Sequence, residues 1–314
     1  MDPFDDLLRG VRASGAVFSE SVLSAPWALR FAGDAFLTLC IPLRGEGWIV
    51  QGEGRPRRVR EGDAAIVRGP EPFWFTDEPA SAGRPGLARE ARCGAVDPVP
   101  PPEATEAGRT VLVAGAYRLR GEIPQRLLRV LPPVLVVTDG EDCSGMRDYL
   151  ESQLCKAVPG RQIVVDRLLD WLLVCTLREW FDHPEAAPPA WYQALGDDVV
   201  GPVLRAMHQA PAEPWTLASL AAEADVSRST LAKRFTDLVG EPPLGYLTDW
   251  RMALAADLLT EPGATIAGVA RRVGYADAFG FSAAFKRVRG VSPSAHRATV
   301  TLPQPAGSSS GTRP

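Results

Sequence analysis

Histidine is scarce in this chain of 314 residues, and only His183, His208 and His296 are present. None falls in the first 182 residues, so a metal centre built on clustered imidazole ligands is not expected there. Cysteine is scattered, odd in number and never arranged as C-x-x-C: Cys40, Cys93, Cys143, Cys155 and Cys175. This usage favours reduced thiols in a cytosol over a disulfide framework, with a redox-sensing pair as the less favoured alternative.

Long apolar runs are also missing. No uncharged apolar stretch approaches the roughly 18 residues that a membrane-spanning helix needs, so no membrane association is expected. The acidic N-terminus, Met1–Asp6, lacks the basic and then apolar layout of a secretory signal. The hydrophobic fraction of 46% is ordinary for a globular chain, and the length suggests two domains. We therefore expect a cytoplasmic protein with two domains.

Two helix-turn-helix patterns lie about fifty residues apart in the last third of the chain. In the first, Thr216 and Ser227 are predicted N-caps of two successive helices. Leu231 and Phe235, four residues apart, form the buried stripe of the second helix. Gly240 suits the end of that helix, because glycine adopts the positive φ of a helix C-cap. The second helix of such a motif is the one that enters a DNA major groove.

The second pattern repeats this logic. Thr265 and Asp277 are predicted caps, Gly274 makes the turn, and Phe281 and Phe285 form the buried stripe. A long helix between the two patterns is predicted from its apolar positions, which are Leu244, Leu247, Trp250, Leu254 and Leu258. One such pattern would be a weak signal, whereas two in tandem are a strong one.

At these residues the chain resembles the AraC/XylS family of transcriptional regulators over residues 197–298. The resemblance implies a seven-helix module whose two recognition helices enter successive major-groove segments on one face of DNA. Most of the matching positions specify the fold, and only outward residues read DNA. The matching residues are Ala221, Ser227, Leu231, Phe235, Gly240, Arg251, Ala255, Leu258, Ala270, Gly274, Tyr275, Asp277, Phe281, Phe285, Gly290, Pro293 and Arg297.

The formal net charge is −4, but the distribution matters more than the sum. Residues 262–297 hold six basic residues and one acid, which suits a factor that binds chosen DNA sites. In the recognition helix of the second pattern, Ala278, Phe279 and Ala283 stand where members of the family often carry Gln or Arg. We therefore expect the recognition helix of the first pattern to read bases and that of the second to hold phosphates. The predicted DNA-binding residues are Arg228, Ser229, Thr230, Lys233, Arg234, Arg271, Arg272, Ala278, Phe279, Ser282, Ala283, Lys286 and Arg287.

Residues 1–182 have a different character. Short segments of strand composition, at 36–43, 47–50, 64–67 and 73–76, alternate with turns rich in Gly, Pro and Asp. The Glu61-Gly62-Asp63-Ala64 turn and Arg68-Gly69-Pro70 resemble a cupin half-motif, as found in one branch of the AraC family. The fold class expected is α+β with two domains: a cupin-like β-barrel followed by helices, then an all-α double helix-turn-helix domain.

Many cupins are metalloenzymes, so a cupin enzyme is one alternative function and a non-enzymatic interaction module is another. Because the predicted barrel has no histidine, we expect no metal, no cofactor and no catalytic residue, and favour a receptor for a small organic molecule. The candidate effector-binding residues are Arg44, Trp48, Arg68, Phe73, Trp74 and Phe75. Ordinary core packing is the alternative for each aromatic residue among them.

Two helices should follow the barrel, at 142–153 and 163–181. The second is apolar nearly all round and therefore requires burial on every side, which favours a homodimer over a helix sandwiched between the domains. The candidate dimer residues are Leu168, Trp171, Leu172 and Cys175. Residues 183–196 read as a linker, and residues 97–108 and the tail at 299–314 read as flexible.

The sequence thus predicts a regulator of transcription. Its expected partners are promoter DNA, an unknown small-molecule effector, RNA polymerase and a second copy of the chain. The residues do not distinguish activation from repression, and they name neither the operator nor the effector.

Overall fold

The computed structural model describes residues 2–8, 11–16, 22–91, 109–118, 121–138 and 141–301. The chain forms two compact units, one made of residues 7–120 and 124–188, the other of residues 1–6, 121–123 and 189–314. The predicted flexible segment 97–108, residues 302–314 of the predicted tail and the side chains of Cys93 and Cys143 lie outside the described residues. Residues 299–301 of that tail belong to a helix. Within the described ranges, no helix is long and apolar enough to cross a bilayer.

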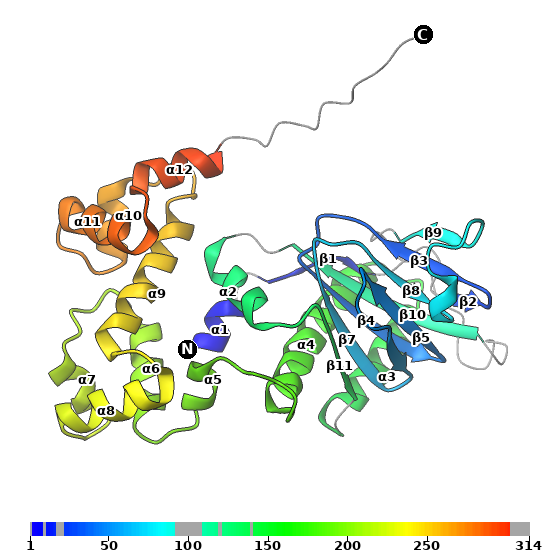
Figure 1. Cartoon of the computed structure of the whole chain (residues 1–314), viewed down its shortest axis with the longest axis horizontal. Helices are drawn as coiled ribbons and strands as arrows, with labels where there is room; N and C mark the ends of the chain where they lie inside the picture. Colours follow the sequence, from blue (N-terminus) through cyan, green and yellow to red (C-terminus); the bar gives the residue numbers. More distant parts are fainter. Residues whose placement is uncertain are drawn as a thin grey trace, which may run out of the picture. The chain divides into compact units, whose positions relative to one another are not determined.

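The larger unit is built on two β-sheets (Figure 1). The first has the order β1-β10-β4-β7-β11, with β2 also paired to β10, and all its pairs are antiparallel. Its strands are β1 (Ala13–Ala16), β2 (Val22–Ser24), β4 (Leu37–Arg44), β7 (Asp63–Arg68), β10 (Arg109–Tyr117) and β11 (Val134–Thr138).

The second sheet has the order β6-β5-β8-β3-β9, in which only the β3–β9 pair is parallel. Its strands are β3 (Ala28–Phe31), β5 (Glu46–Gln51), β6 (Arg57–Arg60), β8 (Phe73–Thr76) and β9 (Ala88–Glu90), and a short 3₁₀ helix, η1 (Pro79–Ser81), follows β8. The four strands predicted from composition are confirmed as β4, β5, β7 and β8. The nine-residue β10 was not predicted.

The hydrophobic core lies between the two sheets. Residues of the first sheet, including Cys40 and Leu112, pack in one cluster with Ile49 and Phe75 of the second. The side-chain period of two explains which residues enter it: along β5, Gly47, Ile49 and Gln51 are buried while the residues between them are partly exposed.

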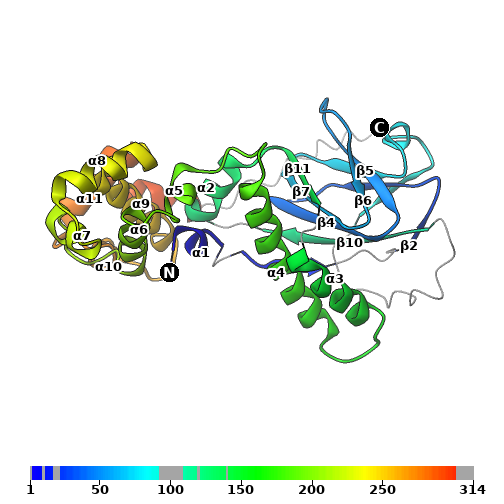
Figure 2. The ribbon, with the colours of Figure 1, turned by 90° about the horizontal axis from the view of Figure 1, so that it is seen from below.

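Two helices of the sheet-rich unit, α3 (Glu141–Leu154) and α4 (Arg161–Asp182), follow its last strand and confirm both predicted helices. Two shorter helices, α1 (Pro3–Leu8) and α2 (Glu122–Val130), have residues in both units. Helix α4 lies along the first sheet, and α3 packs beside α4 (Figure 2). The buried face of α4 includes Val165, Leu169 and Leu173, which are at most 1% exposed.

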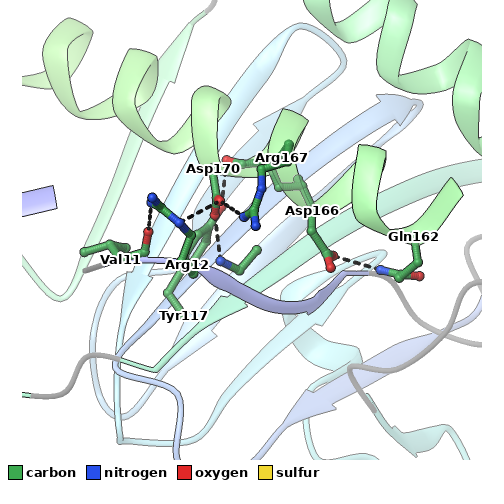
Figure 3. Close-up of polar contacts among 9 residues, drawn as sticks. Val11, Arg12, Tyr117, Gln162, Asp166, Arg167 and Asp170 are labelled. Atoms are coloured by element: carbon green, nitrogen blue, oxygen red, sulfur yellow. Dashed lines mark hydrogen bonds and ion pairs between the residues drawn. The ribbon is translucent and has the colours of Figure 1, made fainter. Parts of the chain in front are cut away.

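Polar contacts fix the inner side of α4 to the sheet (Figure 3). Asp170 accepts a hydrogen bond from the Ala13 backbone N–H at 2.6 Å and pairs with Arg167 at 2.8 Å. The hydroxyl of Tyr117, on β10, donates to the Leu169 carbonyl at 2.7 Å. Burial raises the pKa of Tyr117 well above its usual value, and the nearby carboxylate of Asp170 adds to this, so the phenol remains a neutral donor.

The other compact unit is helical, and its long helix α9 runs from the α7–α8 pair to the α10–α11 pair (Figure 1). The helices are α5 (Ala190–Ala194), α6 (Val200–Gln209), α7 (Leu217–Glu223), α8 (Arg228–Val239), α9 (Pro243–Leu258), α10 (Ile266–Arg272), α11 (Ala278–Arg289) and α12 (Pro293–Thr301). Each pair has its own core, and α9 contributes to both, with Leu247 in the first and Met252 in the second.

One predicted core position on α9 is wrong. Leu244 is 41% exposed, whereas Pro243, Tyr246, Leu247 and Trp250 are buried. These four residues follow the spacing i, i+3, i+4 and i+7 of a single helix face, and Leu244 lies off that face.

Candidate functional site

The same hydrogen-bond pattern closes both helix-turn-helix units. The backbone N–H of Val226 donates to the Ala221 carbonyl at 3.0 Å, and that of Tyr275 donates to the Ala270 carbonyl at 2.9 Å. Before α7, the side chains of Thr216 and Ser219 each accept from the other's backbone N–H, which satisfies two donors that the helix start leaves open. The two units therefore hold their second helices in the same way.

In each unit, the residue that precedes the donor of this hydrogen bond has a left-handed backbone conformation. It is Asp225 in the first unit, with φ of 50°, and Gly274 in the second, with φ of 81°. A Cβ at position 274 would lie 2.6 Å from the Ala212 carbonyl oxygen and 2.9 Å from the Arg251 guanidinium. Position 274 therefore requires glycine for two reasons, the positive φ and the lack of space for a Cβ. Position 225 requires only the positive φ, which aspartate can adopt.

Helix α8 presents polar side chains to solvent. The Ser227 hydroxyl caps the helix by accepting from the Thr230 backbone N–H at 3.1 Å. It also lies 2.9 Å from the Ser229 hydroxyl and 2.8 Å from that of Thr230. All three residues are exposed, as are Arg228 and Lys233 on the same helix. The predicted readers Ser229 and Thr230 therefore share a hydroxyl cluster at the start of α8.

Arg234 has a partner that the sequence did not reveal. Its Nε and Nη2 atoms donate to one carboxylate oxygen of Asp197 at 3.0 Å and 2.7 Å. The other oxygen of Asp197 accepts from the backbone N–H groups of Val199 and Val200, both at 2.9 Å, at the start of α6. Arg234 thus helps to join α8 to α6 in addition to any contact with DNA.

Burial of Asp197 opposes its ionisation, but the hydrogen bonds from Arg234, Val200 and Val199 outweigh that effect and lower the pKa of Asp197. A folded-state pKa below the ordinary value means that the ionised carboxylate stabilises the fold. That stabilisation is present above the usual pKa of aspartate and is lost as pH falls through the lowered value.

Helix α11 presents a different surface. Phe279, in its first turn, is 86% exposed, and Ala283 one turn later is also exposed. The Ser282 hydroxyl donates to the Ala278 carbonyl at 2.7 Å and is therefore directed back to its own helix. The Asp277 carboxylate caps α11 by accepting from the Gly280 backbone N–H at 2.8 Å.

The cations of the second helix-turn-helix unit lie in the last turns of α10 and α11. Arg271, Lys286 and Arg287 are exposed, and Arg272 pairs with Glu261 at 2.6 Å. Residues 197–261 hold ten acidic and five basic residues, whereas residues 262–297 hold one acidic and six basic. The attraction to a polyanion is therefore concentrated in the second half of the helical unit.

The candidate effector residues do not gather in one place. Phe75 is a core residue stacked on Trp27, and Arg44 pairs with Glu151. Arg68 donates to the carbonyls of Leu128 and Leu131. Trp48 and Trp74 alternate with the buried Ile49 and Phe75, so their side chains lie on the face of the sheet that is turned away from the core.

Of these candidates, Phe73 lines a cavity with a volume of about 370 Å³ in the described part of the chain, and the other five do not line this cavity. The cavity lies at one end of the two sheets, where segments 32–35 and 69–72 pass from one sheet to the other. Six of its lining residues are small: Ala32, Gly33, Ala35, Gly69, Ala91 and Ala116. In the part of the chain that is described, no group of three or more His, Cys, Asp or Glu residues is arranged to hold a metal.

The candidate dimer residues on α4 divide into two groups. Trp171 is 44% exposed, and Leu168 and Cys175 are half-buried on the same outer side. Leu172 is 2% exposed and belongs to the inner face, so its expected outward position is wrong. A helix that is apolar nearly all round gives no periodic signal to separate inner from outer positions, which explains the error.

Comparison with known proteins supports the architecture. Residues 2–182 match the cupin family profile, and residues 220–299 match a helix-turn-helix domain. A putative AraC-like transcription regulator of Streptomyces lividans is 32% identical over 308 residues, covering 96% of this chain and 100% of the relative. The chain belongs to the AraC family of transcriptional regulators. A second regulator with the same description, from Streptomyces antibioticus, is 32% identical over 302 residues, covering 95% and 98%.

Other matches cover less of the chain. The regulator AlkR of Acinetobacter baylyi is 36% identical over 148 residues, which is 47% of each protein. The C-terminal domain of AraT, a response regulator from Geobacillus stearothermophilus, is 31% identical with a TM-score of 0.33, covering 36% of this chain and 93% of that one. As an AraC-family protein the chain is a DNA-binding transcriptional regulator with a cupin domain and not an enzyme, which confirms those predictions.

Replacement of Asp197 by alanine tests the ion pair that holds Arg234. We expect Asp197→Ala to lower the free energy of unfolding by about 1–2 kcal/mol near pH 7, because two backbone N–H groups at the start of α6 lose their acceptor and Arg234 loses its partner. The difference from the wild type should shrink as pH falls below about 4, where aspartate in the unfolded chain becomes protonated. Urea unfolding at several pH values measures it, with the exposed neighbour Asp198→Ala as the control. An equal loss for both variants would contradict the assignment.

Proposed function

We propose that this regulator acts in the cytoplasm as an effector-responsive dimer that binds two promoter half-sites and works with RNA polymerase. We further propose that its two recognition helices have different tasks: α8 reads bases and α11 holds the phosphate backbone. The observation that carries this division is the contrast between the outward faces of the two helices. Hydrogen-bond donors cover α8, whereas alanine and an exposed phenylalanine occupy the first turns of α11.

Base reading by α8 follows from the donors that it exposes. Lys233 carries three N–H donors, which suit the O6 and N7 acceptors of guanine in the major groove. Ser229 and Thr230 carry hydroxyls that donate or accept, and these lie in the first turn, next to the cap. In helix-turn-helix proteins the N-terminal residues of the recognition helix are the ones that contact base edges.

Phosphate binding by the second unit follows from its charge. Arg271 on α10 and Arg287 on α11 are exposed, and Arg272 pairs with Glu261. Contacts to phosphates position a protein on DNA and carry no sequence information directly. In the first turns of α11 the Ser282 hydroxyl is bonded back to the Ala278 carbonyl, and no side chain there offers the pair of donors needed for the bidentate contacts that distinguish G·C pairs.

Two alanine substitutions separate the two tasks. Lys233→Ala should weaken binding to the preferred site by about 1–3 kcal/mol and relax the base preference at one or two positions. Arg287→Ala should weaken binding to all sequences alike and reduce the slope of log K against log salt by about one unit. Selection from random DNA, followed by fluorescence anisotropy at several salt concentrations, measures both effects. Strongest base preferences under α11, or a changed preferred sequence for Arg287→Ala, would overturn the division.

Phe279 offers one apolar way to read DNA. An exposed aromatic ring in the first turn of a recognition helix can contact the methyl group of thymine. Replacing each thymine under α11 by uracil removes that methyl, and at one position we expect a loss of about 0.8 kcal/mol, close to fourfold in affinity. The loss should vanish in Phe279→Ala, and uracil under α8 is the control. A wild type indifferent to every uracil would rule out this contact.

The outer side of α4 supports the proposed dimer. Val164, Leu168, Trp171 and Cys175 follow steps of four, three and four residues, the spacing of a helix-packing seam. Val164 and Trp171 are 37% and 44% exposed, while the inner side of the same helix is fixed to the sheet by Asp170. A second copy of α4 would cover this stripe and remove its apolar surface from water.

A charge in this stripe tests the dimer. Trp171→Glu should convert the dimer to monomers, because a carboxylate buried without a partner costs several kcal/mol. Light scattering on a sizing column gives the mass, and circular dichroism shows whether the fold is retained. Ala157→Glu, at an exposed position between α3 and α4, adds the same charge outside the stripe and should leave the dimer intact. A folded Trp171→Glu dimer would argue against this interface.

A further inference from the structure

The cavity of about 370 Å³ in the sheet-rich unit has a size typical of small-molecule sites. Its position is set by two cross-strand pairs. Phe31 and Phe73 are register partners on β3 and β8, and Thr38 and Ala116 are partners on β4 and β10. Each pair belongs to one of the two sheets, and all four residues line the cavity. The cavity is therefore the space between the ends of the two sheets.

Its apolar wall is aromatic. The rings of Phe31 and Phe73 stack with their centroids 4.3 Å apart and an interplanar angle of 13°. The two side chains are 7% and 4% exposed, so the wall is packed and held in place. Such a wall favours an aromatic or aliphatic body in the ligand, because contact with the rings removes apolar surface from water.

Small residues keep the space open, and one of them cannot be enlarged. A Cβ at Gly69 would lie 2.0 Å from the Ala35 carbonyl oxygen, so the two segments that bound the cavity touch at this glycine. Ala32 and Gly33 are exposed at the opening. The volume is thus a consequence of where the chain crosses between the sheets, and it does not require a side chain to move.

The charged residues at the cavity select the charge of the ligand. Among the residues that the structure describes, the charged ones that line it are Asp34, Glu71 and Arg118. The Arg118 guanidinium pairs with Asp34 at 2.9 Å, so these two charges neutralise each other. Among the described residues, no hydrogen bond or ion pair reaches the Glu71 carboxylate. Only the Glu71 backbone carbonyl is engaged, accepting from the Gln51 side chain at 3.4 Å. Within the described part of the lining, the Glu71 carboxylate is therefore the negative charge that a bound molecule can approach.

We propose that this cavity is the effector site and that it takes a small molecule with an apolar or aromatic body and a positively charged group. The body lies against Phe31 and Phe73, and the cation faces Glu71. This inference rests on the proposed effector-responsive function and specifies its ligand. It differs from the candidate set predicted from the sequence, whose charged members are Arg44 and Arg68, since the arginine at this cavity is Arg118 and pairs with Asp34.

Three probes of one shape and different charge test the proposal on the full chain: benzylammonium, benzyl alcohol and benzoate. Titration calorimetry should rank their affinities in that order, with benzylammonium about fivefold tighter than benzyl alcohol, equivalent to about 1 kcal/mol. Glu71→Gln should remove this difference, and the exposed Glu53→Gln, outside the cavity, should preserve it. High salt should also reduce the preference, because Glu71 is exposed.

A blocked opening provides the second test. Ala32→Phe places a ring at the exposed rim, where folding is not at risk, and should weaken all three probes at least tenfold. Ala88→Phe, at an exposed position on β9 outside the cavity, is its control. Tightest binding of benzoate, or unchanged binding in Ala32→Phe, would overturn the proposal.

Binding to promoter DNA separates this inference from the function on which it rests. Fluorescence anisotropy on the DNA upstream of the regulator's own gene is measured with and without benzylammonium. A probe that binds in the expected order but leaves DNA affinity unchanged would refute the sensing role while supporting the ligand class. A response of DNA affinity to some other compound, together with no probe binding in the cavity, would refute the site and leave the sensing role standing.

Discussion

One backbone hydrogen bond in each helix-turn-helix unit determines where its recognition helix points. The bonds from Val226 to Ala221 and from Tyr275 to Ala270 each close a turn around a left-handed residue. Ala221 and Ala270 are buried at 2% and 0% exposure, and their small side chains allow the two helices to approach closely. Every outward residue of α8 and α11 inherits its direction from this turn. Side chains that contact DNA can therefore differ between the units without a change in the fold.

The distribution of charge then limits what each unit can do. Residues 197–261, which include the first helix-turn-helix unit, hold ten acidic and five basic residues. The overall charge of this half therefore does not attract phosphate. Arg234, one of its few cations, is engaged by Asp197 in holding α8 to α6. The second unit has the opposite balance. In the proposed division of labour, the cations of the second helix-turn-helix unit supply sequence-independent attraction to DNA. Helix α9 contributes to both cores and so fixes the spacing between α8 and α11.

Features encoded by neighbouring residues could be predicted from the sequence. Thr216, Ser227, Thr265 and Asp277 all accept the hydrogen bonds of predicted caps, because an N-cap and its partner are three residues apart. Features that join distant residues could not. Asp197 lies 37 positions from Arg234, and nothing local marks the pair. On α4, Leu172 was expected to face outward because its neighbours are apolar on every side, and only the packed sheet distinguishes the two faces.

The same limit explains the effector residues. Aromatic side chains in a strand suggest a pocket, but the period of two sends Trp48 and Trp74 to the outer face and Phe75 into the core, and only Phe73 reaches the cavity. Space arises instead where alanine and glycine gather at the sheet ends, which composition alone does not reveal. That location also has a structural consequence. On β10, Ala116 lines the cavity, and its neighbour Tyr117 bonds to α4 through Leu169. A ligand bound in the cavity would therefore contact the same strand that holds α4 through Tyr117.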